Sequence, residues 1–368
     1  VGSEMCIRDR DSINGIKAGH AAGMKVIHIP DTIEINDDIR RLTSVVCHSL
    51  SDVPDIIDTW NEGKVADVEG YYENAKINRV YVDRVHVKKA FAEYTAAYNA
   101  DDPKIKLKID HTYRVAALCE RIAKAAGMCA YDVELAWLSG MLHDVGRFEQ
   151  IKRYNTFSDA DSVDHAKFGA DLLFKDGLIS TFLNGMVKCT GYKPGALEDR
   201  YSSDGVFLYD RLNKSDMEML ELAIRCHNMY RIPQGLNRRE QAFCNVLRDA
   251  DKVDIFKVNI DTPLEEIYNT TTEELMKSDI TDEVLEAFDE EHCILKAIRR
   301  TPADTVIGHV SLAYELVYDE SVRITVEQGY LAKLMHFHSD NEETNRKMAM
   351  VREKMDSYVK KRIGEKDA

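Results

Sequence analysis

Helical periodicity dominates the chain from about Val85 to its last residue. Apolar side chains recur there at helical spacing, together with helix starts and stops, for example a start at Asp132 and stops at Gly127 and Pro233. No segment shows a sustained two-residue alternation, and no internal repeat is found. With 368 residues, 44% of them hydrophobic, the chain has ample apolar material for a packed core. The pattern predicts a mainly α protein.

The first 60 residues show a different pattern. A helix capped by Ser12 and ended by Gly23 precedes the apolar segment Lys25–Ile29, which Pro30 stops. A helix followed by a short buried strand is half of a βαβ unit, so we predict a piece of a parallel α/β sheet. Residues 61–84 are polar without a clear period, and we predict a linker to the helical region 85–368.

Two short motifs in this first region carry a resemblance. They are DSINGIKA at residues 11–18 and AGMKVI at residues 22–27. They resemble the C-terminal end of haloacid-dehalogenase-type phosphatases of the β-phosphoglucomutase group, which implies a truncated, Rossmann-like α/β remnant over residues 1–60. In that family the motif's acidic residues hold magnesium, but Arg10 stands where the first acid is expected, and the family's nucleophilic Asp lies far upstream. We therefore expect a remnant without chemistry of its own.

The opening segment VGSEMCIRDR, residues 1–10, begins with Val rather than Met. It resembles translated sequence from the end of a metagenomic read. We expect the chain to be a fragment and these residues to have no structural role.

Charge and hydropathy exclude several classes of partner. The chain has 49 Lys and Arg against 64 Asp and Glu, a formal net charge of −15, whereas nucleic acids and anionic membranes recruit clustered positive charge. No apolar run approaches the roughly 18 residues that a membrane helix needs. The eight cysteines form no CxxC pair and no signal-peptide pattern opens the chain, so we predict a reduced, cytoplasmic protein. A small anionic substrate stays compatible, because a bound metal inverts the local field.

Six histidine and aspartate side chains are predicted to point into buried helix faces. His111 continues the apolar stripe of Leu107 and Val115, and the adjacent pair His143-Asp144 ends the apolar segment LSGMLHD. Burial of so many polar groups is costly unless something satisfies them, and a divalent cation would do so. The set consists of His111, His143, Asp144, His165, His227 and Asp251.

The ligand types limit the choice of metal. Imidazole mixed with carboxylate suits Mn, Fe, Co, Ni or Zn better than calcium, and Mg stays among the candidates. Structural zinc is not expected, because no thiolates cluster in the sequence. The stretch from Asp159 to Asp161 is interpreted as a solvated loop or helix cap. The remaining histidines are predicted to lie at the surface: His20, His28, His48, His86, His292, His309, His336 and His338.

The order His…His-Asp…Asp resembles the signature of the HD-domain metal-dependent phosphohydrolases. It is carried by HTYRV at 111–115, LHDVGRF at 142–148 and RDADK at 248–252, and the resemblance covers residues 85 to about 365. It implies an all-helical HD-domain bundle. It also implies that His111, His143, Asp144 and Asp251 ligate a first metal ion, Asp251 being chosen over Asp249 because the family's last aspartate directly precedes a Lys or similar residue.

Two further histidines match positions that bind a second ion in two-metal members of that family. They are His165 and His227, for which phosphate-binding or structural roles stay open. A carboxylate such as Asp144 could bridge two ions, one activating water and one neutralising the phosphoryl group. Four basic residues near the motifs are candidate phosphate clamps, with a plain surface charge as the alternative for each: Arg114, Arg147, Lys167 and Lys252.

The leading hypothesis is a divalent-metal-dependent phosphohydrolase, with Asp144 and His143 in the catalytic centre, acting on a small phosphorylated molecule such as a nucleotide. One alternative is a catalytically silent nucleotide-binding regulatory module, which the intact ligand set disfavours. Another is an HD-type nuclease, against which the charge of −15 and the missing helicase motifs count. A phosphatase in the N-terminal region would lack its nucleophile. Residues 258–368 are expected to extend the HD domain and complete the pocket, while the exact substrate and the oligomeric state stay open.

Overall fold

The computed structural model describes residues 13–28, 42–46, 82–99, 101–183, 214–268 and 270–364. The chain divides into two compact units. Unit 1 comprises Val1–Ala92, Gly127–Leu135 and Ile179–Asn213, and unit 2 comprises Glu93–Ala126, Ala136–Leu178 and Lys214–Ala368. The six predicted metal ligands all belong to unit 2.

The described part of unit 1 contains short elements. Helix α1 (Ile13–Ala21) is followed by strands β1 (Ile27–His28) and β2 (Val45–Val46), which pair in parallel with Ile27 opposite Val45. Strand β1 lies inside the segment predicted as a buried strand. The wider α/β remnant stays a prediction, because most of residues 1–60 and of the predicted linker lie outside the described ranges. His28 is only 8% exposed, so its predicted surface position is wrong.

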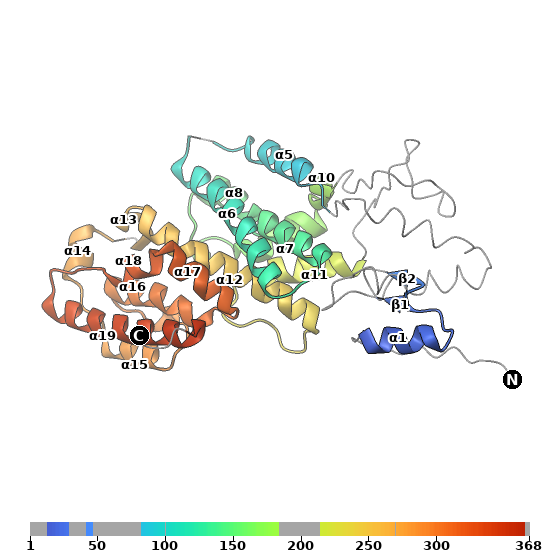
Figure 1. Cartoon of the computed structure of the whole chain (residues 1–368). Coiled ribbons are helices and arrows are strands. Elements are labelled where there is room, and N and C mark those ends of the chain that lie inside the picture. Colours follow the sequence, from blue (N-terminus) through green and yellow to red (C-terminus); the bar gives the residue numbers. More distant parts are fainter. Residues whose placement is uncertain are drawn as a thin grey trace. The chain divides into compact units, whose positions relative to one another are not determined.

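Unit 2 is built from helices (Figure 1), which confirms the prediction of a mainly α protein. Helix α5 (Arg84–Thr95) and helix α7 (Ala130–Leu142) each begin in unit 1 and end in unit 2, and α10 (Ile179–Leu183) lies in unit 1. The helices around the site are α6 (Pro103–Ala125), α8 (Val145–Tyr154), α9 (His165–Ala170), the π-helical turn η3 (Asp171–Lys175), α11 (Lys214–Cys226) and α12 (Arg238–Asp261). In the part of the chain that the structure describes, no helix is long and apolar enough to cross a membrane.

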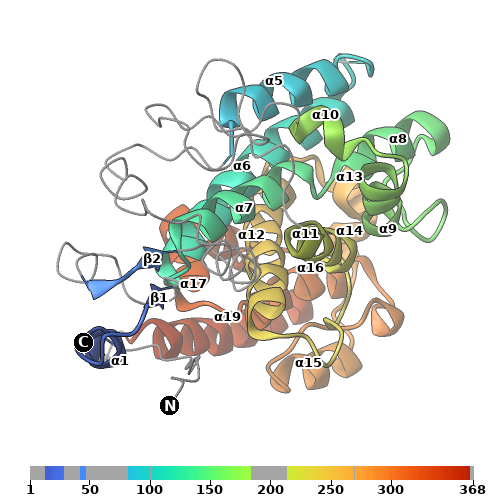
Figure 2. The same cartoon turned by 90° about the vertical axis from the view of Figure 1, so that its right-hand side faces the viewer.

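Two long helices form the frame of the site. Asp102 caps α6 by accepting a hydrogen bond from the backbone N–H of Lys104, and Pro103 occupies the first turn. Asn237 and Glu240 form a reciprocal capping box at the start of α12. Helix α12 packs against α6 and α11, as Figure 2 shows from the side. These contacts bring the buried faces of α6 and α12 together.

The C-terminal part of unit 2 has an apolar core of its own. Its members include Phe256 from α12, Phe288, Ile307 and Met348, all at most 1% exposed. The elements are α13 (Leu264–Tyr268), α14 (Thr272–Lys277), α15 (Asp282–Asp289), η5 (Lys296–Ile298), α16 (Pro302–Val310), η6 (Ser311–Glu315), α17 (Asp319–Gln328), α18 (Tyr330–Met335) and α19 (Glu342–Ile363). Because α12 also contacts α17 and α18, this core supports the helix that carries Asp251.

Candidate metal centre

His111 lies on the buried face of α6, and α12 surrounds it with two carboxylates. Its Nε2 atom is 3.2 Å from Oδ1 of Asp251. Its Nδ1 atom is 2.6 Å from Oδ2 of Asp254, which lies one turn further along α12. Asp254 also accepts two hydrogen bonds from the guanidinium of Arg114, at 2.6 and 2.9 Å. Asp254 therefore fixes the orientation of the His111 ring.

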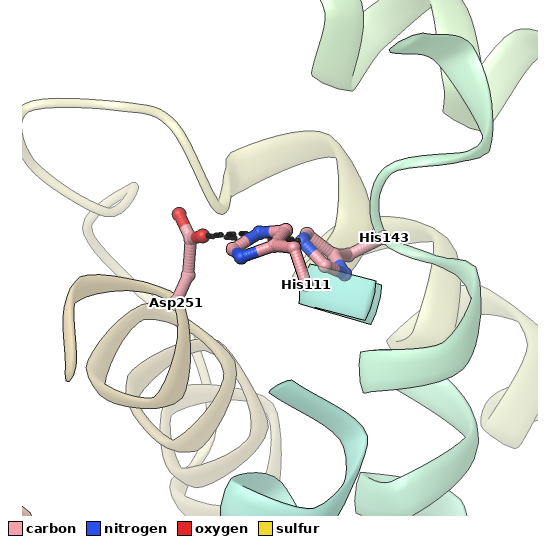
Figure 3. A group of neighbouring side chains, drawn as sticks. All are labelled: His111, His143 and Asp251. Carbon is pink, nitrogen blue, oxygen red and sulfur yellow. Dashed lines mark hydrogen bonds and ion pairs between the residues drawn. The ribbon is translucent and has the colours of Figure 1, made fainter. Parts of the chain in front are cut away.

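His143 follows the last residue of α7 and faces His111 across a close helix contact (Figure 3). Its Nδ1 donates to the carbonyl oxygen of Gly140 at 2.8 Å, and its Nε2 lies 3.3 Å from Nε2 of His111. A Cβ atom at Gly140 would lie 2.6 Å from the Cα of Ala116 in α6. The missing side chain at Gly140 thus allows the approach that brings the two imidazoles together.

His165 and His227 form a second pair. Their Nε2 atoms are 3.0 Å apart. The Nδ1 of His165 lies 2.7 Å from Oδ2 of Asp159, and the Nδ1 of His227 donates to the carbonyl oxygen of Ile224 at 2.7 Å. The short distance between α8 and α9 depends on Gly146, where a Cβ would lie 2.4 Å from the carbonyl oxygen of His165.

Asp144 lies between the two pairs and presents one carboxylate oxygen to each. Oδ2 is 3.5 Å from Nε2 of His111 and 3.6 Å from Nε2 of His143. Oδ1 is 3.6 Å from Nε2 of His165 and 3.7 Å from Nε2 of His227. The side chain of Asp144 is only 2% exposed, so its charge is held away from bulk water.

The chemistry of these donors fits a metal ion. Carbonyl oxygens face the Nδ1 atoms of His143 and His227, so these Nδ1 atoms carry the proton and their Nε2 atoms present lone pairs. Carboxylate oxygens face the Nδ1 atoms of His111 and His165 and favour the same tautomer. The lone pairs converge with carboxylate oxygens, an arrangement that repels itself unless a cation lies among them. Ligand atoms of His111, His143 and Asp251 lie within 4.8 Å of one another, as do those of His143, Asp144 and His227.

Burial and charge shift the pKa values of this cluster. Burial lowers the pKa of both His165 and His227 to about 4, so both rings are neutral at neutral pH. Burial alone would raise the pKa of Asp144, but the Lys108 ammonium and the nearby imidazoles outweigh it and hold that pKa well below its usual range. Burial alone would lower the pKa of His111, but hydrogen bonds to Asp251 and Asp254 outweigh it and raise that pKa. The centre therefore combines the ionised Asp144 with neutral rings at His165 and His227, the protonation states that metal binding requires.

Two of the predicted phosphate clamps lie within the cluster and are held by carboxylates. Arg147 has its Nε 3.8 Å from Oδ1 of Asp144, and its Nη1 donates to Oδ1 of Asp159 at 2.9 Å. Arg114 binds Asp254, as described above, and its side chain is 31% exposed. Each arginine thus supports a residue that orients a ligand histidine, and contact with phosphate stays a prediction for both.

In the described part of the chain, the other two predicted clamps, Lys167 and Lys252, form no hydrogen bond with the four clustered histidines. Lys167 is 58% exposed and pairs with Asp164 at 2.8 Å. Lys252 is half-buried on α12 next to Asp251. Burial and the nearby Arg248 lower the pKa of Lys252 to about 8. Their contact with phosphate also stays a prediction.

Sequence reasoning missed three residues that contact the ligand set. Lys108 and Asp254 are three residues from His111 and Asp251 on their helices, so same-face spacing was an available signal for both. Asp159 gave no such signal, because it lies in a loop between helices. Asp159 lies in a loop, as interpreted from the sequence, and its side chain, 32% exposed, also binds His165, a contact that the sequence did not predict.

Asp249, the alternative to Asp251, faces another way. Its carboxylate accepts hydrogen bonds from the backbone N–H groups of Val317 and Tyr318 and from the hydroxyl of Ser321. It thereby binds the start of α17, and its side chain is committed to the C-terminal helices.

Comparison with known proteins agrees with this geometry. Residues 109–257 match the family model of the HD domain, a segment that contains all six predicted ligands. The match shows that this segment, less than half of the chain, is similar to the HD domain, whose superfamily consists in general of metal-dependent hydrolases. No curated protein and no solved structure matches the chain. The resemblance of residues 1–60 to haloacid-dehalogenase-type hydrolases has no support from these comparisons and stays a prediction.

Proposed function

We propose that this protein is a divalent-metal-dependent phosphohydrolase that cleaves a phosphoester of a small phosphorylated molecule. The observation that carries the proposal is the position of Asp144, whose two oxygens lie within 3.5 to 3.7 Å of two separate histidine pairs. A catalytically silent binding module has no need for this arrangement. Two-metal phosphohydrolases do, because they stabilise both the attacking and the leaving oxygen.

Each residue has an assigned part in this proposal. His111, His143, Asp251 and Asp144 would hold a first ion, and His165 and His227 would hold a second ion together with Asp144. When bound, such ions lower the pKa of a coordinated water to about 7 and polarise a phosphoryl oxygen. Asp254 and Asp159 would keep the proton of His111 and His165 on Nδ1, so that Nε2 stays available.

Charge limits the size of the proposed substrate. A protein with a net charge of −15 repels long polyanions such as nucleic acids, whereas a small phosphate ester needs only a local positive field. Lys108 and Arg147, both next to Asp144, contribute to that field. Free thiols are found at Cys119, Cys226, Cys244 and Cys293, which supports the proposal of a reducing, cytoplasmic setting.

The test is a metal-reconstitution screen. The protein is stripped with a chelator, reloaded separately with Mn, Fe, Co, Ni, Zn or Mg, and assayed for phosphate release from nucleotides and sugar phosphates. We expect turnover with at least one metal, none without metal, and none in the isosteric Asp144→Asn variant. Lys106→Met, whose side chain is 70% exposed, is the control and should retain turnover.

The alternatives give different results in the same screen. Retained metal and nucleotide binding without any phosphate release would contradict the proposal and favour a regulatory module. Cleavage of long DNA or RNA in preference to small esters would contradict it in favour of a nuclease.

A further inference from the structure

Lys108 is a basic side chain that contacts Asp144 directly. It lies one turn before His111 on the same face of α6, and its Nζ is 2.8 Å from Oδ2 of Asp144. The side chain is 18% exposed, so the ammonium is mostly withdrawn from water. The ring of Phe157 lies 5.4 Å from that ammonium and supports it by a cation–π contact.

The Lys108 ammonium lies where a positive charge opposes metal binding. Lys108 donates to the same carboxylate oxygen that faces Nε2 of His111 at 3.5 Å and Nε2 of His143 at 3.6 Å. A positive side chain here disfavours a divalent ion a few ångströms away, because like charges repel strongly where water is excluded. A residue that only supported metal binding would be expected to be neutral or negative.

A bound anionic ligand would offset the cost of placing this positive charge beside a metal ion. A carboxylate oxygen accepts more than one hydrogen bond, and an ammonium has three donors, so Lys108 can contact Asp144 and a second oxygen together. Arg147 lies on the same Phe157 ring at 5.6 Å, but its Nη1 is already committed to Gln150, Phe157 and Asp159. Lys108 has fewer such commitments, its one hydrogen bond among the described residues being to Asp144.

We propose that Lys108 binds a non-bridging oxygen of the substrate's phosphoryl group at the metal centre, and that its charge weakens the binding of the divalent ion beside it. This inference rests on the proposed function. It makes Lys108 a direct substrate contact, and it predicts effects of opposite sign on metal and on phosphate.

The test uses Lys108→Met, which keeps the apolar stem and removes the charge. Metal affinity is measured on the chelator-stripped protein by Mn²⁺ titration against a chromophoric chelator. Affinity for inorganic phosphate is measured calorimetrically on the Mn²⁺-loaded protein. We expect Mn²⁺ to bind about tenfold more tightly in the variant, from the removed repulsion. Phosphate should bind roughly 10- to 100-fold more weakly, from the loss of one charge-assisted hydrogen bond.

Two further variants make the test decisive. Lys106→Met is the matched control, because Lys106 is on the same helix, is 70% exposed and pairs with Asp110 at the surface. It should change neither affinity. Lys108→Arg keeps the charge, and it should retain phosphate binding and leave Mn²⁺ affinity near that of the wild type. If Lys108→Met fails to fold, loss of phosphate binding in Lys108→Arg overturns the proposal.

The opposite result has a clear meaning. Weaker Mn²⁺ binding with unchanged phosphate affinity in Lys108→Met would show that Lys108 only holds Asp144 in place, and would overturn the proposal. Neither measurement needs turnover. A protein that binds phosphate through Lys108 but hydrolyses nothing would therefore defeat the proposed function alone, whereas full hydrolysis and phosphate binding in Lys108→Met would defeat this inference alone.

Discussion

The two histidine pairs of the centre differ in their carboxylates. The His111–His143 pair has Asp251 of its own, 3.2 Å from His111, in addition to the shared Asp144. Among the described residues, the Nε2 atoms of the His165–His227 pair face one carboxylate, that of the shared Asp144, through Oδ1 at 3.6 and 3.7 Å. The first pair thus belongs to a complete set of two imidazoles and two carboxylates, and the second does not. We expect the first pair to bind metal more tightly.

The carboxylate that orients the first pair is also more buried and better supported than the one that orients the second pair. Asp254, which holds His111, is 1% exposed and is itself fixed by Arg114. Asp159, which holds His165, is 32% exposed and lies in a loop. A buried orienting carboxylate on a long helix is more rigid than one on a loop. The half that contains His111 and His143 is therefore anchored by residues on the long helices α6 and α12. The half that contains His165 and His227 depends on Asp144 and on a carboxylate in a loop.

The largest expected effect is that of Asp144→Ala, because this carboxylate serves both halves. The change removes a shared negative charge and leaves Asp251 as the one carboxylate of the predicted ligand set beside four imidazoles. We expect phosphate release to fall below detection, a loss of at least about 10³-fold. The assay is phosphate release at saturating Mn²⁺. Activity near that of the wild type would contradict the assignment of Asp144.

His165→Ala should have a smaller effect, because the first half keeps its complete ligand set. We expect one ion to remain bound and turnover to fall by about 10²- to 10³-fold, the usual cost of losing one electrostatic contribution to the transition state. Elemental analysis and phosphate release are measured on the same preparation. If neither quantity changes, the centre binds a single metal and His165 is structural.

A smaller effect is expected at Asp159, which acts only through His165. Asp159→Asn keeps the shape but weakens the hold on Nδ1, and should lower affinity for the second ion by about tenfold, at the low end of such changes. Affinity for the first ion should not change. The exposed neighbour Asp161 provides the control variant Asp161→Asn. An equal loss of affinity for both ions would mean that the two halves do not bind metal independently.

The smallest effect at neutral pH concerns His309, a histidine outside the centre. It was predicted to lie at the surface, but its Nδ1 is buried without a hydrogen-bond partner among the described residues. Burial, with the nearby Arg299 and Lys296, lowers the pKa of His309 to about 3. The unfolded chain therefore takes up this proton first, so the stability held above about pH 6.5 is lost as the pH falls toward 3.

His309→Phe removes this dependence. Denaturant unfolding of the wild type and the variant is compared at about pH 7 and about pH 5. The metal centre is the same in both proteins, so the difference between their pH effects isolates His309. We expect the wild type to lose more stability on acidification than the variant. An equal loss in both would show that His309 titrates normally in the folded protein.

Periodicity explains why much of the helical region was predictable. Helical spacing of apolar residues locates α6 and α12, and it directs His111 to a buried face and Asp251, whose side chain is 16% exposed, toward His111. Spacing also contained the signal for Asp254, which shares the face of Asp251. What spacing cannot give is the contact between residues far apart in the chain, such as Asp159 with His165 through a loop.

The errors on buried histidines have a similar cause. His309 follows Gly308, where a Cβ would overlap the guanidinium of Arg299 at 2.2 Å. That packing depends on how the segment around Arg299 folds back on α16, and no local sequence pattern predicts such a contact. The four clustered histidines were more predictable, because several of them converge on one place and a cation would satisfy them together.

The central claim is that Asp144 joins two metal-binding halves of unequal strength. The most direct measurement is a Mn²⁺ titration of the chelator-stripped wild type, with elemental analysis of each step and the same titration of Asp144→Ala. The account predicts two ions per chain in the wild type, bound in two separate steps, and none held tightly by Asp144→Ala. Tight binding of metal by Asp144→Ala at the wild-type level would contradict it.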